Sequence, residues 1–261
     1  MFSFKNIIRL IGVLIALSMS SSALAQSNCE INFIMLGDSI TQGLMRDANG
    51  VLSGVITEPN GADLDQGSYG PSLRGQTQAL GCDSVRAFNW GVGGFTASQG
   101  IGLADQAIAS LSQVTSEESL NIALIMFGAN DAFSRTPRSS FINSISLIQS
   151  RISAAGILPV LATITENQTP FPELNDRVNE FNSDIIAFAQ QQSLILVDQN
   201  SAVTPFSVLN SGDRLHISAA GYEVMATAWF NGVESVLVEY IESLRTTDFL
   251  PAVYLLLLED E

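Results

Sequence analysis

The chain of 261 residues is poor in the side chains that usually build metal sites, since it has one histidine, His216, and two cysteines, Cys29 and Cys82. Structural zinc sites take four cysteine or histidine ligands, and the sequence has no cluster rich in either residue. We therefore expect no metal and no other cofactor. The single histidine is open to two interpretations, an ordinary packing residue or a catalytic base.

Positive charge is also scarce. Lys5 is the only lysine, and 11 basic residues stand against 26 acidic ones, which gives a formal net charge of −15. Such a surface repels nucleic acid and anionic lipid headgroups, so we expect no nucleic-acid partner.

No apolar run approaches the roughly 20 residues that a membrane-spanning helix needs. The N-terminal segment carries Lys5 and Arg9, then an apolar run from Leu10 to Leu17, then the small-residue pattern Ala23-Leu24-Ala25. This pattern predicts a secretory signal peptide over residues 1–25 and a secreted or periplasmic protein. The remaining 236 residues, with nine arginines against 26 acids and a net charge of −17, fit one α/β domain.

A second apolar run, residues 249–258, ends in three acids. Pro251 disfavours a helix, so we expect an extended segment that packs along its own domain or against a second copy of the chain. A disordered end is the alternative. We therefore divide the chain into a signal peptide (1–25), a catalytic domain (26–246) and an apolar C-terminal tail (247–261), through which self-association is possible.

Short apolar runs alternate with longer helical patterns along the chain. Five runs read as buried strands, over 31–36, 84–90, 121–127, 157–164 and 193–198. Helices are expected between and after them, over 73–80, 103–114, 139–156, 173–192 and 218–244. Continuous apolar strands separated by helices indicate a parallel sheet covered on both faces. The fold class is then a three-layer α/β/α sandwich of the flavodoxin-like type, with a five-stranded parallel sheet in the order 2-1-3-4-5.

Polar motifs follow three of these strands and precede the last helix. They are GDSIT with Ser39, NWGVGG with Gly94, GAND with Asn130, and DRLHIS with Asp213 and His216. Each motif alone could be a turn, a helix start or a helix cap. In the expected strand order Ser39, Gly94 and Asn130 emerge side by side at the carboxyl edge of the sheet, where open sheets bind ligands. The loop after the fifth strand can bring His216 over them.

These four blocks, in this order, resemble those of the GDSL/SGNH hydrolase superfamily, whereas the G-x-S-x-G pentapeptide of α/β-hydrolases is absent around Ser39. The resemblance implies that Ser39 is the nucleophile, His216 the base and Asp213 its partner. It also implies an oxyanion hole made of the Ser39 and Gly94 N–H groups and the Asn130 amide. A serine hydroxyl needs such a base, and the imidazole needs a group that holds its other nitrogen.

The resemblance implies a secreted serine esterase that works through an acyl-enzyme, with short acyl or O-acetyl groups on a small-molecule or polysaccharide ester as the first candidate substrate. The segment GSYGPSLRGQ (67–76) is somewhat similar to the G-x-Y-R-x-x-L stretch of secreted carbohydrate esterases, but Gly70-Pro71 stands where that stretch has arginine. A lipid-directed esterase, namely a lysophospholipase, arylesterase or thioesterase, is the second candidate. A third is an inactive secreted binding or assembly protein, which a missing serine, histidine or asparagine would indicate.

The two cysteines are expected to pair. Cys29 lies two residues before the first strand and Cys82 two residues before the second, and adjacent parallel strands bring those ends together. An oxidising compartment permits the Cys29–Cys82 disulfide. Two free buried thiols are the alternative.

Overall fold

The structure is a computed structural model that describes residues 29–47, 49, 51–52, 61, 63, 67–113, 115–116, 118–168 and 172–258. Its core is one parallel sheet in the order β2-β1-β3-β4-β5, which confirms the predicted fold class. The strands are β1 (Glu30–Gly37), β2 (Ser84–Gly91), β3 (Leu120–Met126), β4 (Leu158–Ala162) and β5 (Ile195–Val197). The expected signal peptide lies outside the described residues.

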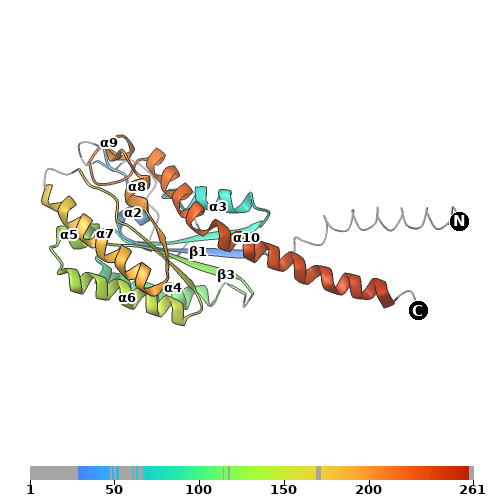
Figure 1. The fold of residues 1–261 in the computed structure, drawn as a ribbon. Coiled ribbons are helices and arrows are strands. Elements are labelled where there is room, and N and C mark those ends of the chain that lie inside the picture. Colours follow the sequence, from blue (N-terminus) through green and yellow to red (C-terminus); the bar gives the residue numbers. More distant parts are fainter. Residues whose placement is uncertain are drawn as a thin grey trace.

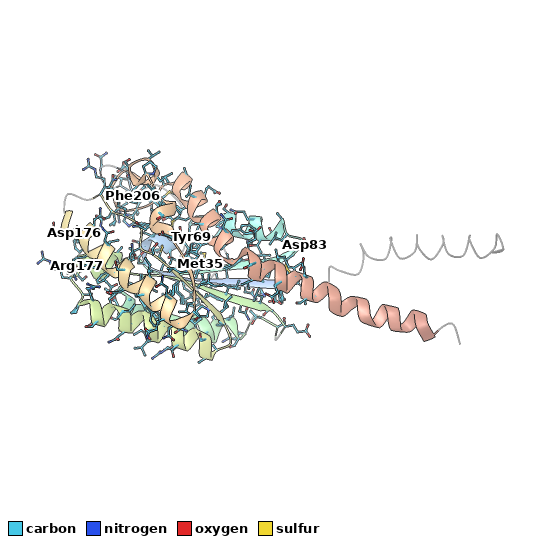
Figure 2. All side chains as sticks on the ribbon, in the orientation of Figure 1. Met35, Tyr69, Asp83, Asp176, Arg177 and Phe206 are labelled. Carbon is cyan, nitrogen blue, oxygen red and sulfur yellow. A yellow bond between two sulfur atoms is a disulfide. The ribbon has the colours of Figure 1, made fainter. Side chains whose placement is uncertain are left out.

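Helices cover both faces of this sheet, because each strand sends alternate side chains to opposite faces. In β1, Phe33 and Met35 enter one core, while Ile34 and Leu36 enter the other. The first core is closed by α3 (Gly70–Gln78) and α10 (Ala219–Leu258), and the second by α4 (Ala97–Leu111), α6 (Arg138–Ala154) and α7 (Pro172–Gln192). Figure 1 shows the sheet between these two layers, and Figure 2 shows Met35 and Tyr69 inside the first core.

Four short helices were not expected from the sequence pattern. They are α2 (Ser39–Gln42), α5 (Ala129–Phe133), α8 (Gln199–Ala202) and α9 (Phe206–Leu209). Each has only four or five residues, which is too short for an apolar repeat of 3.6 residues to become visible. All four follow the carboxyl ends of strands, so they build the edge of the sheet where the polar motifs lie.

The expected disulfide joins Cys29 to Cys82, with 5.4 Å between the two Cα atoms. The register explains it, since Glu30 of β1 pairs with Ser84 of β2 and the residues just before both strands are therefore neighbours. The bond lies at the amino edge of the sheet, away from the polar motifs.

The expectation of an extended C-terminal tail was wrong. Helix α10 continues without interruption from Ala219 to Leu258, through Pro251, and Figure 1 shows its second half extending beyond the sheet. An extended segment must find a sheet edge for its N–H and C=O groups, whereas a helix satisfies them within the segment, so one missing proline N–H is the smaller cost. Among the described residues, no helix is both long and apolar enough to cross a membrane.

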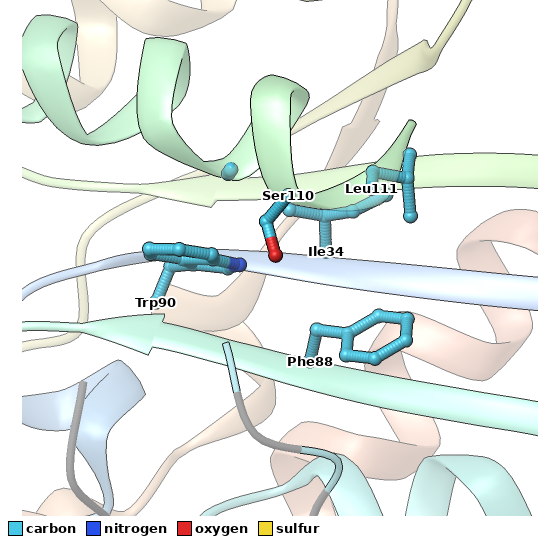
Figure 3. Close-up of a pocket in the computed structure, with 6 residues that line it drawn as sticks. Ile34, Phe88, Trp90, Ser110 and Leu111 are labelled. Carbon is cyan, nitrogen blue, oxygen red and sulfur yellow. The ribbon is translucent and has the colours of Figure 1, made fainter. Parts of the chain in front are cut away.

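A small pocket lies between β1, β2 and α4 (Figure 3). Its walls are mostly apolar, and it is lined by Ile34, Phe88, Trp90, Ala107, Ser110 and Leu111. None of these residues belongs to the polar motifs, so we regard the pocket as a gap in core packing.

Candidate active site

The turn after β1 positions Ser39 as the first residue of α2. The Asp38 carboxylate caps this helix by accepting the Ile40 N–H at 3.0 Å. Gly43 ends it with a left-handed φ of +92°, a conformation that glycine adopts readily. As the first residue of a helix, Ser39 has no acceptor for its N–H within that helix, so the donor remains available.

A hydrogen-bonded chain runs from Ser39 through His216 to Asp213. His216 Nε2 lies 2.9 Å from Ser39 Oγ, although the two residues are 177 positions apart in the sequence. His216 Nδ1 lies 2.6 Å from Asp213 Oδ2. With the ring proton on Nδ1 donated to the carboxylate, Nε2 can accept the proton of the serine hydroxyl. The structure thus brings together three of the residues that the sequence singled out.

The Asp213 carboxylate also shapes the turn that carries His216. Its Oδ1 accepts the N–H groups of Leu215 at 3.0 Å and of His216 at 2.8 Å. Burial alone would raise the pKa of Asp213, but the hydrogen bonds from the His216 ring and from these N–H groups outweigh it and hold the pKa below its usual value. Asp213 is therefore a carboxylate at neutral pH.

The environment of His216 keeps its imidazole neutral. Only 6% of the residue is exposed, and burial lowers its pKa below the usual value despite the hydrogen bond and the charge of Asp213. The charge of Arg46 lowers it further. A neutral imidazole can accept a proton, so His216 is in the form that a general base requires.

The remaining candidate donors lie on the turns that follow β2 and β3. Gly94 has a φ of +83° in the turn after β2, and a methyl group added at its Cα would meet no atom within 4 Å, so its backbone faces open space. The neighbouring Gly93 lies close to Ser39, since its added Cβ would be 3.8 Å from that of the serine. Asn130 donates one N–H of its amide to the Phe95 carbonyl at 3.0 Å, which leaves the second N–H for a ligand.

Two side chains that the sequence did not single out, the buried Asn89 and the half-buried Gln42, hold these turns together. Asn89, at the end of β2, donates to the Thr41 carbonyl at 3.1 Å and accepts the Gly91 N–H at 2.7 Å. Gln42 accepts the Gly93 N–H at 2.9 Å. The polar Asn89 between the aromatic residues Phe88 and Trp90 was the one signal that could have revealed this role.

Two buried acids lie beside the candidate donors. Asp131 Oδ2 accepts the Ala97 N–H at 2.8 Å and so ties α5 to the start of α4. Burial raises the pKa of Asp131, and it raises the pKa of Asp38 to about 7, with a smaller contribution from the charge of Asp131. These positions therefore bind a proton more tightly than exposed aspartates do.

The segment after α2 packs on the turn that carries His216. The Arg46 N–H donates to Ser211 Oγ at 3.0 Å, and the Ser211 N–H donates to the His216 carbonyl at 2.8 Å. The described part of the 44–72 insert thus borders the candidate site.

The comparisons with known proteins agree with this geometry. The sequence model of the GDSL-like Lipase/Acylhydrolase family matches residues 35–224. No functionally curated protein shows significant sequence similarity.

Several solved structures have a similar fold. An acetylxylan esterase from Geobacillus stearothermophilus is 19% identical, with 80% of this chain and 96% of that chain covered and a TM-score of 0.60. A lipase/acylhydrolase from Enterococcus faecalis is 21% identical, with 78% and 95% covered and a TM-score of 0.61. The aryl esterase of M. smegmatis is 16% identical, with 78% and 98% covered and a TM-score of 0.61. Since the family match spans most of the chain and includes all four polar motifs, the chain belongs to the GDSL-like lipase/acylhydrolase family.

Proposed function

We propose that the chain is a serine esterase in which Ser39 is the nucleophile, His216 the general base and acid, and Asp213 the residue that orients and stabilises the imidazole. The observation that supports this assignment best is the short hydrogen-bonded chain of 2.9 Å and 2.6 Å that joins the three side chains. A binding protein without activity has no need of this arrangement.

The reaction follows from the positions of these groups. His216 Nε2 takes the hydroxyl proton as Ser39 Oγ attacks the ester carbonyl carbon, and the carbonyl oxygen becomes an oxyanion. The N–H groups of Ser39 and Gly94 and the Asn130 amide are the donors proposed to stabilise it. Collapse of this intermediate breaks the bond to the alcohol oxygen, which takes the proton from His216 and leaves.

Water completes the cycle. It attacks the acyl-enzyme while His216 accepts one of its protons, and a second tetrahedral intermediate releases the carboxylic acid and restores the Ser39 hydroxyl. One imidazole accepts and returns every proton, and ester hydrolysis changes no oxidation state, so the proposed cycle requires no redox partner.

Short acyl esters are the proposed substrates, with O-acetyl groups on carbohydrate as one class. The fold likeness to an acetylxylan esterase is consistent with that class, although at 19% identity it supports the fold and not the substrate. Apolar esters are the second class, and the exposed side chains of Phe133, on the same helix as Asn130, and of Val208, on α9, favour them. The predicted signal peptide and the Cys29–Cys82 disulfide support secretion or export to the periplasm.

A substrate panel tests this proposal. The purified chain should hydrolyse p-nitrophenyl acetate and butyrate, and rates on esters of rising chain length, measured beside acetate release from acetylated xylan, should reveal the preferred class. Ser39→Ala is the control and should abolish hydrolysis of every substrate that the parent accepts. Full activity in Ser39→Ala would refute the proposed nucleophile.

A further inference from the structure

The most exposed large apolar side chains of the described residues are Val208, Phe133 and Val51, with exposed fractions of 71%, 68% and 60%. Single exposed apolar residues are common on soluble proteins, but apolar side chains that gather around one site indicate a contact surface. Phe133 lies on the helix that carries Asn130, while Val208 and Val51 lie on segments joined by hydrogen bonds to the loop that carries His216 or to the residues just after it. Leu52, 48% exposed, lies beside Val51.

Phe133 lies on the side of the oxyanion donors. It ends α5, three residues after Asn130, and residues three apart share one face of a helix. The two residues between them, Asp131 and Ala132, are buried and face the core. The Phe133 ring therefore projects from the protein next to the Asn130 amide.

Val208 lies on a helix that is tied to the segment following the base. It belongs to α9, and the chain leaving α9 runs antiparallel to the segment that carries His216, with Asn210 paired to Ile217. The Ser218 N–H donates to the Leu209 carbonyl at 2.8 Å. These bonds fix α9, which carries Val208, against the residues that directly follow His216.

Val51 and Leu52 are held by a turn in the 44–72 insert. Asp47 accepts the Val51 N–H at 2.8 Å with its side chain and donates its own N–H to the Val51 carbonyl at 2.9 Å. Leu52 pairs with Arg46, whose N–H donates to Ser211 in the loop before His216. Hydrogen bonds thus connect the turn that carries this exposed apolar pair to the loop that carries the base.

We propose that Val51, Leu52, Phe133 and Val208 form an apolar rim that contacts the surface of an emulsified or aggregated uncharged ester, so that the site draws its substrate from an apolar phase. The inference rests on the proposed esterase function and selects apolar esters over acetylated carbohydrate. Three of the four side chains are aliphatic and supply no hydrogen bonds for sugar hydroxyls. The net charge of −15 disfavours an anionic surface, which leaves a neutral one.

The structure also supplies a matched control. Leu147 on α6 and Ile186 on α7 are exposed large apolar residues as well, with exposed fractions of 49% and 37%, but they lie on the helices that cover one face of the sheet. Serine at these two positions removes exposed apolar surface without changing the rim.

Binding is tested first, without catalysis. In a Ser39→Ala background, the parent, a rim variant (Val51→Ser, Leu52→Ser, Phe133→Ser and Val208→Ser) and the control variant (Leu147→Ser and Ile186→Ser) are sedimented with a tributyrin emulsion. The rim variant should bind at least about tenfold more weakly, because burial of several apolar side chains is lost, and the control should bind like the parent. Circular dichroism and melting temperature verify that all three fold. Equal binding of parent and rim variant would overturn the proposal.

Activity is tested next, with Ser39 intact. The ratio of rates on emulsified tributyrin and on dissolved p-nitrophenyl acetate should fall about tenfold in the rim variant and stay constant in the control. A selective loss on acetylated xylan would instead assign the rim to carbohydrate and overturn the proposal. A parent that hydrolyses none of the three substrates would refute the esterase function, whereas the binding experiment would still decide whether the rim contacts apolar surfaces.

Discussion

The two edges of the sheet are built in different ways. At the carboxyl edge, short helices and turns hold polar groups in buried positions, including Asp38 and Asp131, whose pKa values burial raises. At the amino edge, the Cys29–Cys82 disulfide joins β1 to β2, and Tyr240 of α10 donates to the Glu118 carbonyl at 3.0 Å. Buried acids destabilise a fold, while cross-links stabilise it. The comparison suggests that the amino edge offsets the cost of building a reactive carboxyl edge.

The largest expected effect is at the carboxyl edge. His216→Ala should lower kcat/KM on p-nitrophenyl acetate by at least about 10⁴-fold, because it removes the imidazole nitrogen that lies 2.9 Å from Ser39 Oγ and is proposed to accept its proton. Steady-state kinetics measure the loss. A variant with more than a tenth of the parent's activity would show that the base lies elsewhere.

At the amino edge, the expected effect is on stability. Replacing Cys29 and Cys82 by alanine should reduce the free energy of unfolding by about 4 kcal/mol, since the sequence separation of 53 residues makes the closed loop long. Urea unfolding measures this change, and kcat of the folded variant should stay near that of the parent. A loss of kcat as large as that of the active-site variants would show that the disulfide at the amino edge is needed for catalysis at the carboxyl edge.

Asn130→Ala should lower kcat by about 10²–10³-fold, the usual effect of removing one oxyanion donor. The side chain also donates to the Phe95 carbonyl, so a change in KM would reveal that the turn carrying Gly94 has moved. Asn130→Asp keeps the size of the side chain but removes both N–H groups, and it should be as slow as the alanine variant. A fast aspartate variant would refute the role of the amide.

Stability should depend on pH through Asp38. Its pKa is raised from 3.8 to about 7, so the folded chain keeps this proton over a range in which the unfolded chain has lost it. The stabilisation is complete below about pH 4 and is lost as pH rises to about 7. From pH 5 to pH 8, the free energy of unfolding of the parent should therefore fall relative to that of Asp38→Asn by on the order of 2–3 kcal/mol. Urea unfolding at both pH values measures this difference, and parallel pH dependences would contradict it.

The smallest effect on catalysis is expected from the C-terminal tail. Deleting residues 248–261 should leave kcat unchanged, because this part of α10 lies past the amino edge, far from Ser39 (Figure 1). Any effect should be on melting temperature or on elution volume in gel filtration, which would report a role in stability or self-association. Unchanged values of both would show that the tail contributes nothing to the folded protein.

The sequence was informative wherever a single residue type carries the chemistry. Ser39, Asp213 and His216 were predicted as one group, and the structure places them in hydrogen-bond contact. The disulfide was predicted from the position of each cysteine before a strand. The tail was predicted wrongly, because Pro251 was expected to end the helix. Instead, the long helix that begins at Ala219 continues through it to Leu258.

By itself, the sequence predicted the strands and the helices that alternate with them, because periodicity is a local property. The order of the strands followed from the fold class that this alternation is typical of, and the candidate reactive residues followed from four motifs that resemble a known family. Only the tertiary structure decided how Asn89 and Gln42 hold the glycine turn beside Ser39, and how Asp131 ties α5 to α4. It also decided that the insert packs on the turn carrying His216. These contacts join segments that are distant in sequence. Neither segment alone specifies its partner, because the hydrogen-bond partners meet only when the sheet brings the ends of its strands to one edge.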